Sequence, residues 1–201
     1  MRQPWVVGFD LDLTLVDSRP GVAAVLRELN VRTGASVDVD LVISRLGPPL
    51  RVELANWFPT HQVDDAVALY RSLYPQLAVA RSPALPGAHE AVAAARADGG
   101  VAVVISAKIA PLVQLHLDHL GLTVDAVAGD RFGDGKSQAM ADHGVRAYVG
   151  DHVADMAAAQ AAGALGIGVA TGPCTANELR GAGATVVLPG LVDLPGWLIR
   201  G

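Results

Sequence analysis

The sequence has few cysteines, lysines and aromatic residues. Cys174 is the only cysteine among 201 residues, so an internal disulfide is excluded and we expect a reducing compartment. Aromatic residues make up 4% of the chain, and two of the 15 basic residues are lysines. Because 20 residues are acidic, the formal net charge is −5, which argues against nucleic acid or an anionic membrane as the main partner.

Long apolar runs are also missing. No stretch approaches the roughly 20 apolar residues that a membrane-spanning helix needs. A signal peptide needs a basic start and then an apolar stretch of about 7–15 residues, but after Arg2 this stretch is interrupted at Asp10. We therefore expect a cytoplasmic protein without membrane contact. Hydrophobic residues make up 51% of the chain, and its 201 residues are enough for one core, or for one core plus a small insert.

What the sequence does contain is a short apolar run that leads into two carboxylates. Residues 5–9 are typical of a strand buried on both faces, and Asp10 and Asp12 follow directly. Carboxylates at the end of a buried strand cost free energy unless they cap a turn or have a task. In an α/β sheet this end is the carboxyl edge, where ligands bind.

Residues 17–83 differ from the rest because they show helical periodicity and no convincing buried strand. The pattern predicts helices from Pro20 to Gly34, over about 38–46, over 50–58, and from Thr60 to a stop or kink at Pro75. We expect Trp57, Phe58 and Tyr70 to lie in the core of this segment.

From residue 86 the chain alternates between helices and strands. Helices are expected at about 87–97, 110–120, 137–143, 153–162 and 175–181, and strands at 101–105, 123–128, 145–149, 164–170 and 185–188. This alternation predicts an α/β fold with a Rossmann-like parallel sheet and helices on both faces. Residues 1–16 and 84–201 would form this core domain, and residues 17–83 a small helical cap domain inserted at the end of the first strand. The insert would then cover Asp10 and Asp12 as a lid.

Other polar residues fall at the same predicted edge. Ser106 and Asp151 end two strands, Asp155 follows Asp151 by four residues, and Lys136 lies where a helix begins. Each could serve as a cap or surface residue, but together they suit one chemistry. Clustered carboxylates call for a hard cation such as Mg²⁺, and a hydroxyl with a lysine suits a phosphoryl group. One ionised Asp could attack phosphorus while a second carboxyl group transfers protons.

These residues make the chain resemble the haloacid dehalogenase superfamily of hydrolases, in the phosphoglycolate phosphatase-like branch with a helical cap. The first family motif matches Asp10-Leu-Asp12-Leu-Thr14, the second matches residues 101–106, the third matches Lys136, and the fourth matches Gly150-Asp151-His-Val-Ala-Asp155. In order and spacing, the resemblance covers essentially the whole chain. It implies a phosphatase that uses Mg²⁺ and hydrolyses a small phosphorylated metabolite, as a monomer or homodimer.

The resemblance also implies roles for these residues. Asp10 would be the nucleophile that forms an aspartyl-phosphate, and Asp12 the acid/base. Ser106 and Ala107 would bind the phosphate, and Lys136 would balance its charge. The implied Mg²⁺ ligands are Asp10, Asp12 through its backbone carbonyl, and Asp151, with Asp155 a ligand through water or an orienting partner.

Some positions depart from the family pattern and leave alternatives open. Ala107 stands where many relatives have Asn, Ser137 stands where relatives often have Pro, and Lys108 competes with Lys136 for the charge-balancing role. In the insert, Arg45 and Arg51 would contact an acidic substrate if their loop faces the core, and would otherwise be solvated. A phosphomutase, a dehalogenase and a non-catalytic phospho-ligand-binding protein remain alternative functions. Asp12 and Asp151 favour attack on phosphorus over dehalogenation.

Overall fold

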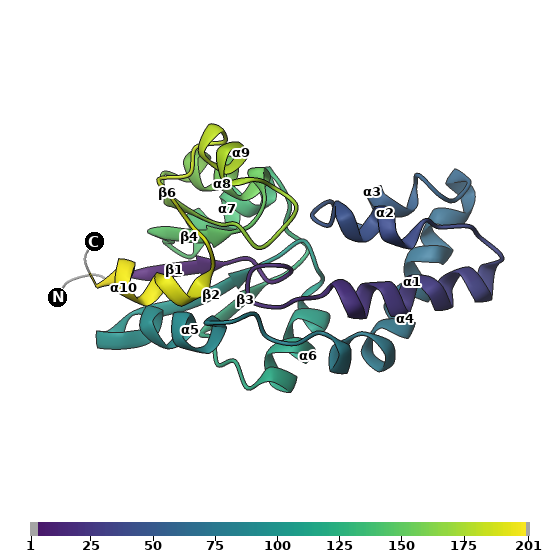
Figure 1. The fold of residues 1–201 in the computed structure, drawn as a ribbon, viewed down its shortest axis with the longest axis horizontal. Coiled ribbons are helices and arrows are strands. Elements are labelled where there is room, and N and C mark those ends of the chain that lie inside the picture. The colour runs from purple at the N-terminus through teal and green to yellow at the C-terminus, as the bar shows by residue number, and fades with distance from the viewer. Residues whose placement is uncertain (1–3, 200–201) are drawn as a thin grey trace.

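Strand β1 (Val6–Phe9) is buried along its whole length because it lies in the middle of a parallel sheet. The structure, a computed structural model, describes residues 4–199, and within them six parallel strands follow the order β3-β2-β1-β4-β5-β6 (Figure 1). The other strands are β2 (Val101–Ile105), β3 (Ala126–Ala128), β4 (Ala147–Gly150), β5 (Leu165–Val169) and β6 (Val186–Leu188). This is the Rossmann order, and it confirms the predicted α/β fold.

The sheet separates two hydrophobic cores, because alternate side chains of β1 point to opposite faces. Val7 and Phe9 pack with one layer of helices, whereas Val6 packs with the other. The first layer contains α5 (Ala88–Arg96), α6 (Ala110–Leu120) and α10 (Leu194–Leu198). The second contains α7 (Asp134–Asp142) and α8 (Val153–Ala161), with α9 (Ala176–Gly181) beside β5 and β6. The sequence did not predict α10, and α7 begins three residues before its predicted start.

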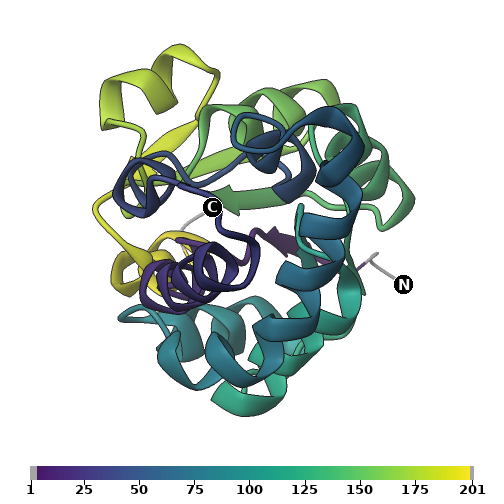
Figure 2. The same ribbon diagram turned by 90° about the vertical axis from the view of Figure 1, so that its right-hand side faces the viewer.

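Four helices form a separate lobe at the carboxyl edge of the sheet (Figures 1 and 2). They are α1 (Arg19–Thr33), α2 (Val39–Ser44), α3 (Leu50–Leu54) and α4 (Val63–Leu77), and we call residues 17–83 the helical lobe. Leu26, Leu54 and Tyr74 are fully buried members of its own hydrophobic core. Phe58 and Tyr70 are buried there as expected, and Trp57 packs against this core. Pro75 lies inside the last turn of α4 and does not end it.

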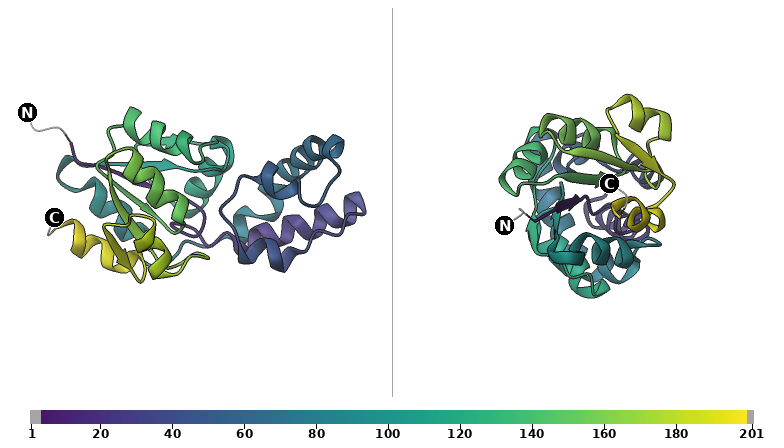
Figure 3. Two further views of the ribbon diagram at one scale, coloured as in Figure 1. Left: turned by 90° about the horizontal axis from the view of Figure 1, so that it is seen from above. Right: turned by 90° about the vertical axis from the view of Figure 1, so that its left-hand side faces the viewer.

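Two neighbouring segments of chain join the helical lobe to the sheet (Figure 3). Val16 pairs with Ala84 in an antiparallel bridge, and the backbone N–H of Asp17 donates to the Pro83 carbonyl at 2.9 Å. The chain therefore leaves the sheet and returns to it at one place, next to the end of β1. Within residues 4–199, no helix has both the length and the apolar character to cross a membrane.

Candidate active site

The turn after β1 fixes the positions of Asp10 and Asp12. The backbone N–H of Asp10 donates to the Val149 carbonyl at 2.9 Å, which continues the sheet by one residue. Leu13 then adopts a left-handed backbone conformation (φ 57°), which is uncommon for a residue with a side chain. The Thr171 hydroxyl donates to the Leu13 carbonyl at 2.5 Å and helps to hold this turn. Such a conformation persists where its surroundings determine it, as happens at functional sites.

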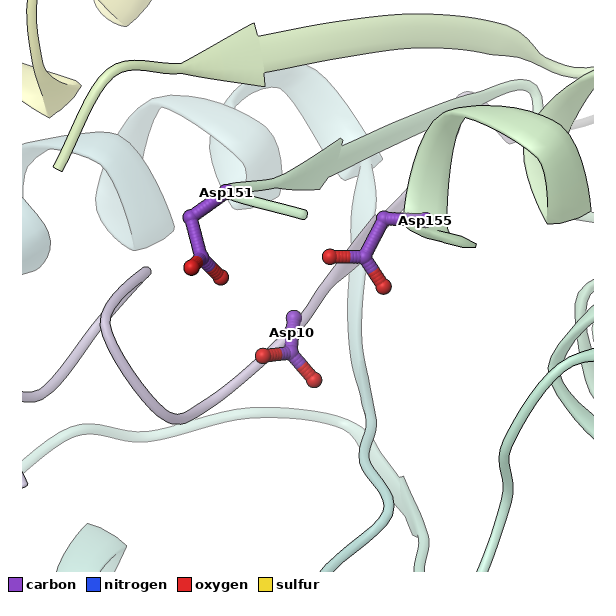
Figure 4. A group of neighbouring side chains, drawn as sticks. All are labelled: Asp10, Asp151 and Asp155. Atoms are coloured by element: carbon purple, nitrogen blue, oxygen red, sulfur yellow. The ribbon is translucent and has the colours of Figure 1, made fainter. Parts of the chain in front are cut away.

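Three buried carboxylates meet at this edge of the sheet: those of Asp10, Asp151 and Asp155 (Figure 4). Asp10 follows β1, Asp151 follows β4, and Asp155 lies in the first turn of α8. One oxygen from each carboxylate lies within 4.8 Å of the others. They converge because β1 and β4 are parallel neighbours whose carboxyl ends share one edge.

Glycines allow this close packing. A Cβ atom at Gly172 would overlap the carboxylate of Asp151, and one at Gly150 would be 2.6 Å from the Cβ of Asp155. Larger residues at either position would therefore displace a member of the cluster.

Lys136 supplies a positive charge to this cluster. Its Nζ donates to Oδ1 of Asp10 at 2.7 Å and to Oδ1 of Asp155 at 2.6 Å. Asp151 instead accepts a hydrogen bond from the Thr14 hydroxyl at 3.1 Å. Burial favours the neutral amine, but the two carboxylates outweigh it and raise the pKa of Lys136 well above its ordinary value. Lys136 is therefore a cation throughout the physiological range.

If all three acids were ionised, the cluster would carry more negative charge than Lys136 neutralises. Burial, despite the opposing charge of Lys136, raises the pKa of Asp10 to about 7. Burial and the charges of Asp10 and Asp155 raise the pKa of Asp151 well above its ordinary range. Raised carboxyl pKa values mean that ionisation is costly here, chiefly because the acids are buried and also because they would repel each other. An all-oxygen donor set with this excess charge fits Mg²⁺, and Asp10, Asp151 and Asp155 are the side chains that would hold it.

Mg²⁺ should therefore stabilise the protein more at pH 8 than at pH 5.5. A cation binds ionised carboxylates, and Asp10, with a pKa of about 7, is mostly protonated at pH 5.5. At about 100 times the Kd, a ligand adds ~2.7 kcal/mol, or ~5–10 °C in Tm for a chain of this size. Thermal unfolding with and without Mg²⁺ at both pH values measures the gain. Asp151→Asn should abolish most of it, and an equal gain at both pH values would contradict the assigned site.

Asp12 lies outside this carboxylate cluster and faces the second lysine. Lys108 Nζ donates to Oδ1 of Asp12 at 2.6 Å and to the Tyr74 hydroxyl at 2.7 Å. Burial opposes ionisation, but the charge and hydrogen bond of Lys108 outweigh it and hold the pKa of Asp12 below its ordinary value. Tyr74 comes from α4, so this contact links the helical lobe directly to the end of β1.

The same chain of contacts ends at His116 on α6. The Tyr74 hydroxyl lies 3.0 Å from Nε2 of His116, whose ring is fully buried. Burial and the positive charge of Lys108 lower the pKa of His116 to about 4, so the imidazole is neutral at pH 7. Since Lys108 already donates to Tyr74, the Tyr74 hydroxyl donates to Nε2. Asp12, Lys108, Tyr74 and His116 thus form a continuous polar chain between the lobes.

A cavity of about 130 Å³ opens between the carboxylate cluster and the helical lobe. Ser106, Ala107 and His152 line it together with Asp10 and Asp12. Ser106 is buried, and its Oγ accepts a hydrogen bond from the Lys108 backbone at 3.2 Å, which leaves the hydroxyl hydrogen free to donate. A phosphoryl group in this cavity would therefore meet a hydroxyl donor and the Lys136 ammonium.

The two lysines have different partners, and so do the two arginines of the helical lobe. Lys136 contacts Asp10, whereas Lys108 contacts Asp12. Arg45 lines the cavity but pairs with Glu53 at 2.7 Å. Arg51 pairs with the exposed Asp64 and is absent from the described residues that line the cavity.

Sequence reasoning missed Tyr74 and Arg71, both of which line the cavity from α4. The four-residue spacing of Tyr70 and Tyr74 was the available signal, because it places both rings on one face of a helix. The helical period predicts residues 63, 66, 69, 70, 73 and 77 on one face. Of these, 63, 66 and 70 are buried and 69, 73 and 77 are partly buried, whereas Tyr74, outside the predicted set, is fully buried.

Comparison with known proteins agrees with this geometry. The sequence model of the haloacid dehalogenase-like hydrolases matches residues 7–160, and a model of related hydrolases matches residues 137–194. Tyrosine-protein kinase PtkA of Mycobacterium tuberculosis is 30% identical over 122 residues, 60% of this chain. The match spans 42% of the length of that kinase.

Other similarities extend over nearly the whole chain. Probable phosphatase IndB of Dickeya dadantii is 28% identical, and the match covers 96% of this chain and 93% of that protein. The solved structure of a haloacid dehalogenase-like hydrolase from Streptococcus pneumoniae has the same fold. Its TM-score is 0.83 at 21% identity, over 96% of this chain and 98% of that one. The family match over residues 7–160 confirms the resemblance recognised in the sequence: the chain belongs to the haloacid dehalogenase-like hydrolases.

Proposed function

We propose that the protein is a Mg²⁺-dependent phosphatase that hydrolyses a small phosphorylated metabolite through an aspartyl-phosphate on Asp10. The observation that carries this proposal is the Asp10 carboxylate, held 2.7 Å from Lys136 at the base of a cavity that Ser106 also lines. The similarity to a protein named as a phosphatase, over nearly the whole chain, supports the same reaction.

In the first step, a carboxylate oxygen of Asp10 attacks phosphorus and the bond from phosphorus to the substrate oxygen breaks. Lys136 reduces the repulsion between Asp10 and the phosphate, and Ser106 donates to a phosphate oxygen. The leaving oxygen takes a proton that Lys108 passes on through Asp12, to which it donates at 2.6 Å. When bound, Mg²⁺ would neutralise charge between the phosphate and its ligands, the carboxylates of Asp10, Asp151 and Asp155 and the Asp12 carbonyl.

In the second step, water attacks phosphorus and releases inorganic phosphate from Asp10. Asp12 accepts the proton from that water. Its lowered pKa suits this role, because it is a carboxylate before the water arrives. Asp12 then passes this proton back to Lys108 along the same hydrogen bond, so the two steps return Asp10, Asp12 and Lys108 to their starting states.

We further propose that the helical lobe, residues 17–83, acts as a cap domain over a core domain of residues 1–16 and 84–201. The cap would exclude bulk water during the transfer, as closing lids do in other enzymes. Tyr74 would hold the cap against the core domain, because its hydroxyl accepts a hydrogen bond from Lys108, the partner of Asp12. The size of the cavity favours a small substrate.

Phosphate release from p-nitrophenyl phosphate tests this function. We expect turnover with Mg²⁺ and a loss of at least ~100-fold in EDTA that added Mg²⁺ restores. If the folded protein releases phosphate from neither this ester nor a panel of small phosphates, the phosphatase proposal fails. Binding without turnover would identify a phospho-ligand-binding protein, and isomerisation of a sugar phosphate without net release would identify a mutase.

A further inference from the structure

The cavity has two chemically different ends. The carboxylates, Lys136 and Ser106 lie at the end formed by the sheet. The opposite wall comes from the helical lobe and from α6, and it is apolar. Its residues include Val22, Leu26, Val42, Leu46, Leu50 and Leu112. The organic part of a phosphate ester, with its phosphate beside Asp10, would therefore lie against aliphatic side chains.

Several of the charged and hydroxyl groups on this mainly apolar side already have partners. Arg45 Nη2 donates to Oε1 of Glu53 at 2.7 Å, and Trp57 Nε1 donates to the same oxygen at 2.8 Å. The Tyr74 hydroxyl is used by Lys108 and His116. The buried Tyr70 and the partly exposed Arg71 also line the cavity, and neither side chain has a hydrogen-bonding or ionic partner among the described residues. The several hydroxyl groups of a sugar would thus lose water while this side of the cavity offers only these two side chains as new partners.

We infer that the substrate is a phosphate monoester whose organic group is mainly apolar, an alkyl or aryl phosphate rather than a sugar phosphate. This inference rests on the proposed phosphatase function and specifies its substrate class. Burial of apolar surface against the wall favours binding of such a group. Polar groups of a substrate that are desolvated without partners weaken binding, which makes the same wall select against sugars.

A matched pair of esters tests the inference. Cyclohexylmethyl phosphate and glucose 6-phosphate share a six-membered ring, one exocyclic CH₂ group and the same kind of primary leaving oxygen, but only the second carries hydroxyl groups and a ring oxygen. Because the chemical step is similar for both, their ratio of kcat/KM reports the fit of the organic group. We expect cyclohexylmethyl phosphate to be preferred by ~100-fold, the order of discrimination that an apolar pocket achieves.

A pair of variants locates the selectivity in this wall. Leu46→Asn places an amide of similar size in the wall, and it should lower the preference by ~10-fold. Leu41→Asn makes the same change at a position on α2 that is 42% exposed and lies outside the cavity lining, so the preference should not change. A preference for glucose 6-phosphate, or equal effects of the two variants, would overturn the inference.

Binding to Asp10→Asn protein separates this inference from the proposed function. Calorimetric titration with both esters should show tighter binding of cyclohexylmethyl phosphate even where no hydrolysis occurs. If the wild-type protein hydrolyses neither ester but this binding preference holds, the phosphatase function fails and the apolar ligand class stands. If the protein hydrolyses the esters but shows no binding preference, the phosphatase function stands and the apolar ligand class fails.

Discussion

Asp10→Asn should lower kcat by at least ~10⁴-fold, because an amide oxygen cannot replace the carboxylate as the nucleophile. The variant should nevertheless fold at least as well as the wild type at pH 8. Ionised Asp10 is unfavourable in this site, where burial raises its pKa to about 7 from an ordinary value of 3.8. Asn has the same shape and no charge. Folding no longer has to bury a charge at this position, and the free energy gained in this way offsets the lost contact with Lys136.

The raised pKa of Asp10 also determines how the effect of Asp10→Asn on stability changes with pH. A carboxyl group whose pKa is raised by folding contributes most to stability below pH 3.8, and this contribution is lost as pH rises through about 7. Wild-type protein without metal should therefore lose stability between pH 5 and pH 8, and Asp10→Asn should lose less. The difference in Tm between variant and wild type, measured by thermal unfolding in EDTA, should grow over this range.

A nearby carboxylate provides the control for this substitution. Asp17 pairs with Arg19 at 2.7 Å on the partly exposed side of the link to the helical lobe. Exposed ion pairs contribute about 0–1 kcal/mol to the free energy of unfolding, so Asp17→Asn should change the fold little. Its kcat should therefore stay within ~3-fold of wild type. Turnover of Asp10→Asn at a comparable level would exclude Asp10 as the nucleophile.

The catalytic edge was predictable because local patterns determine it. Buried strands read as apolar runs, and the residue that follows each run must lie at the carboxyl edge if the strands are parallel. β2 and α6 match their predicted bounds, since an apolar run and a helical period with Gly121 after it mark them clearly. The pairing of β1 with β4 brings Asp10 and Asp151 together, and Asp155 joins them from the first turn of α8.

Other features depend on contacts between distant segments and were not predictable. β3 was expected over 123–128 but is limited to Ala126–Ala128, because only these residues pair with β2. Lys108 and Asp12 are 96 positions apart, and Tyr74 and His116 are 42 apart. Sequence spacing cannot say which lysine faces which carboxylate, since this depends on how α7, which carries Lys136, and the loop between β2 and α6, which carries Lys108, approach the end of β1.

Lys136→Met should destabilise the protein strongly, in contrast to Asp10→Asn. It removes the ammonium between Asp10 and Asp155 and leaves both carboxylates buried without a cation. Breaking a buried pair in this way typically costs ~3–5 kcal/mol. Urea unfolding in EDTA should show this loss at pH 8 and a smaller one at pH 5, where protonation of Asp10 relieves the repulsion. Activity should fall by at least ~10³-fold, because the phosphate also loses its cation.

Lys108→Met is the matched comparison, because it removes the other lysine from the same site. The side chain of Asp12 is 27% exposed, compared with 10% for Asp10, so water can replace part of what Lys108 provides. We expect a loss of about 1 kcal/mol in stability and ~10–100-fold in activity, through Asp12 and its proton transfer. Because Lys108 touches Asp12 and Tyr74, this variant should also raise the pKa that limits kcat at acidic pH. If Lys108→Met instead lost more activity and stability than Lys136→Met, the charge-balancing role would belong to Lys108, and the sheet edge would be organised around Asp12 rather than Asp10.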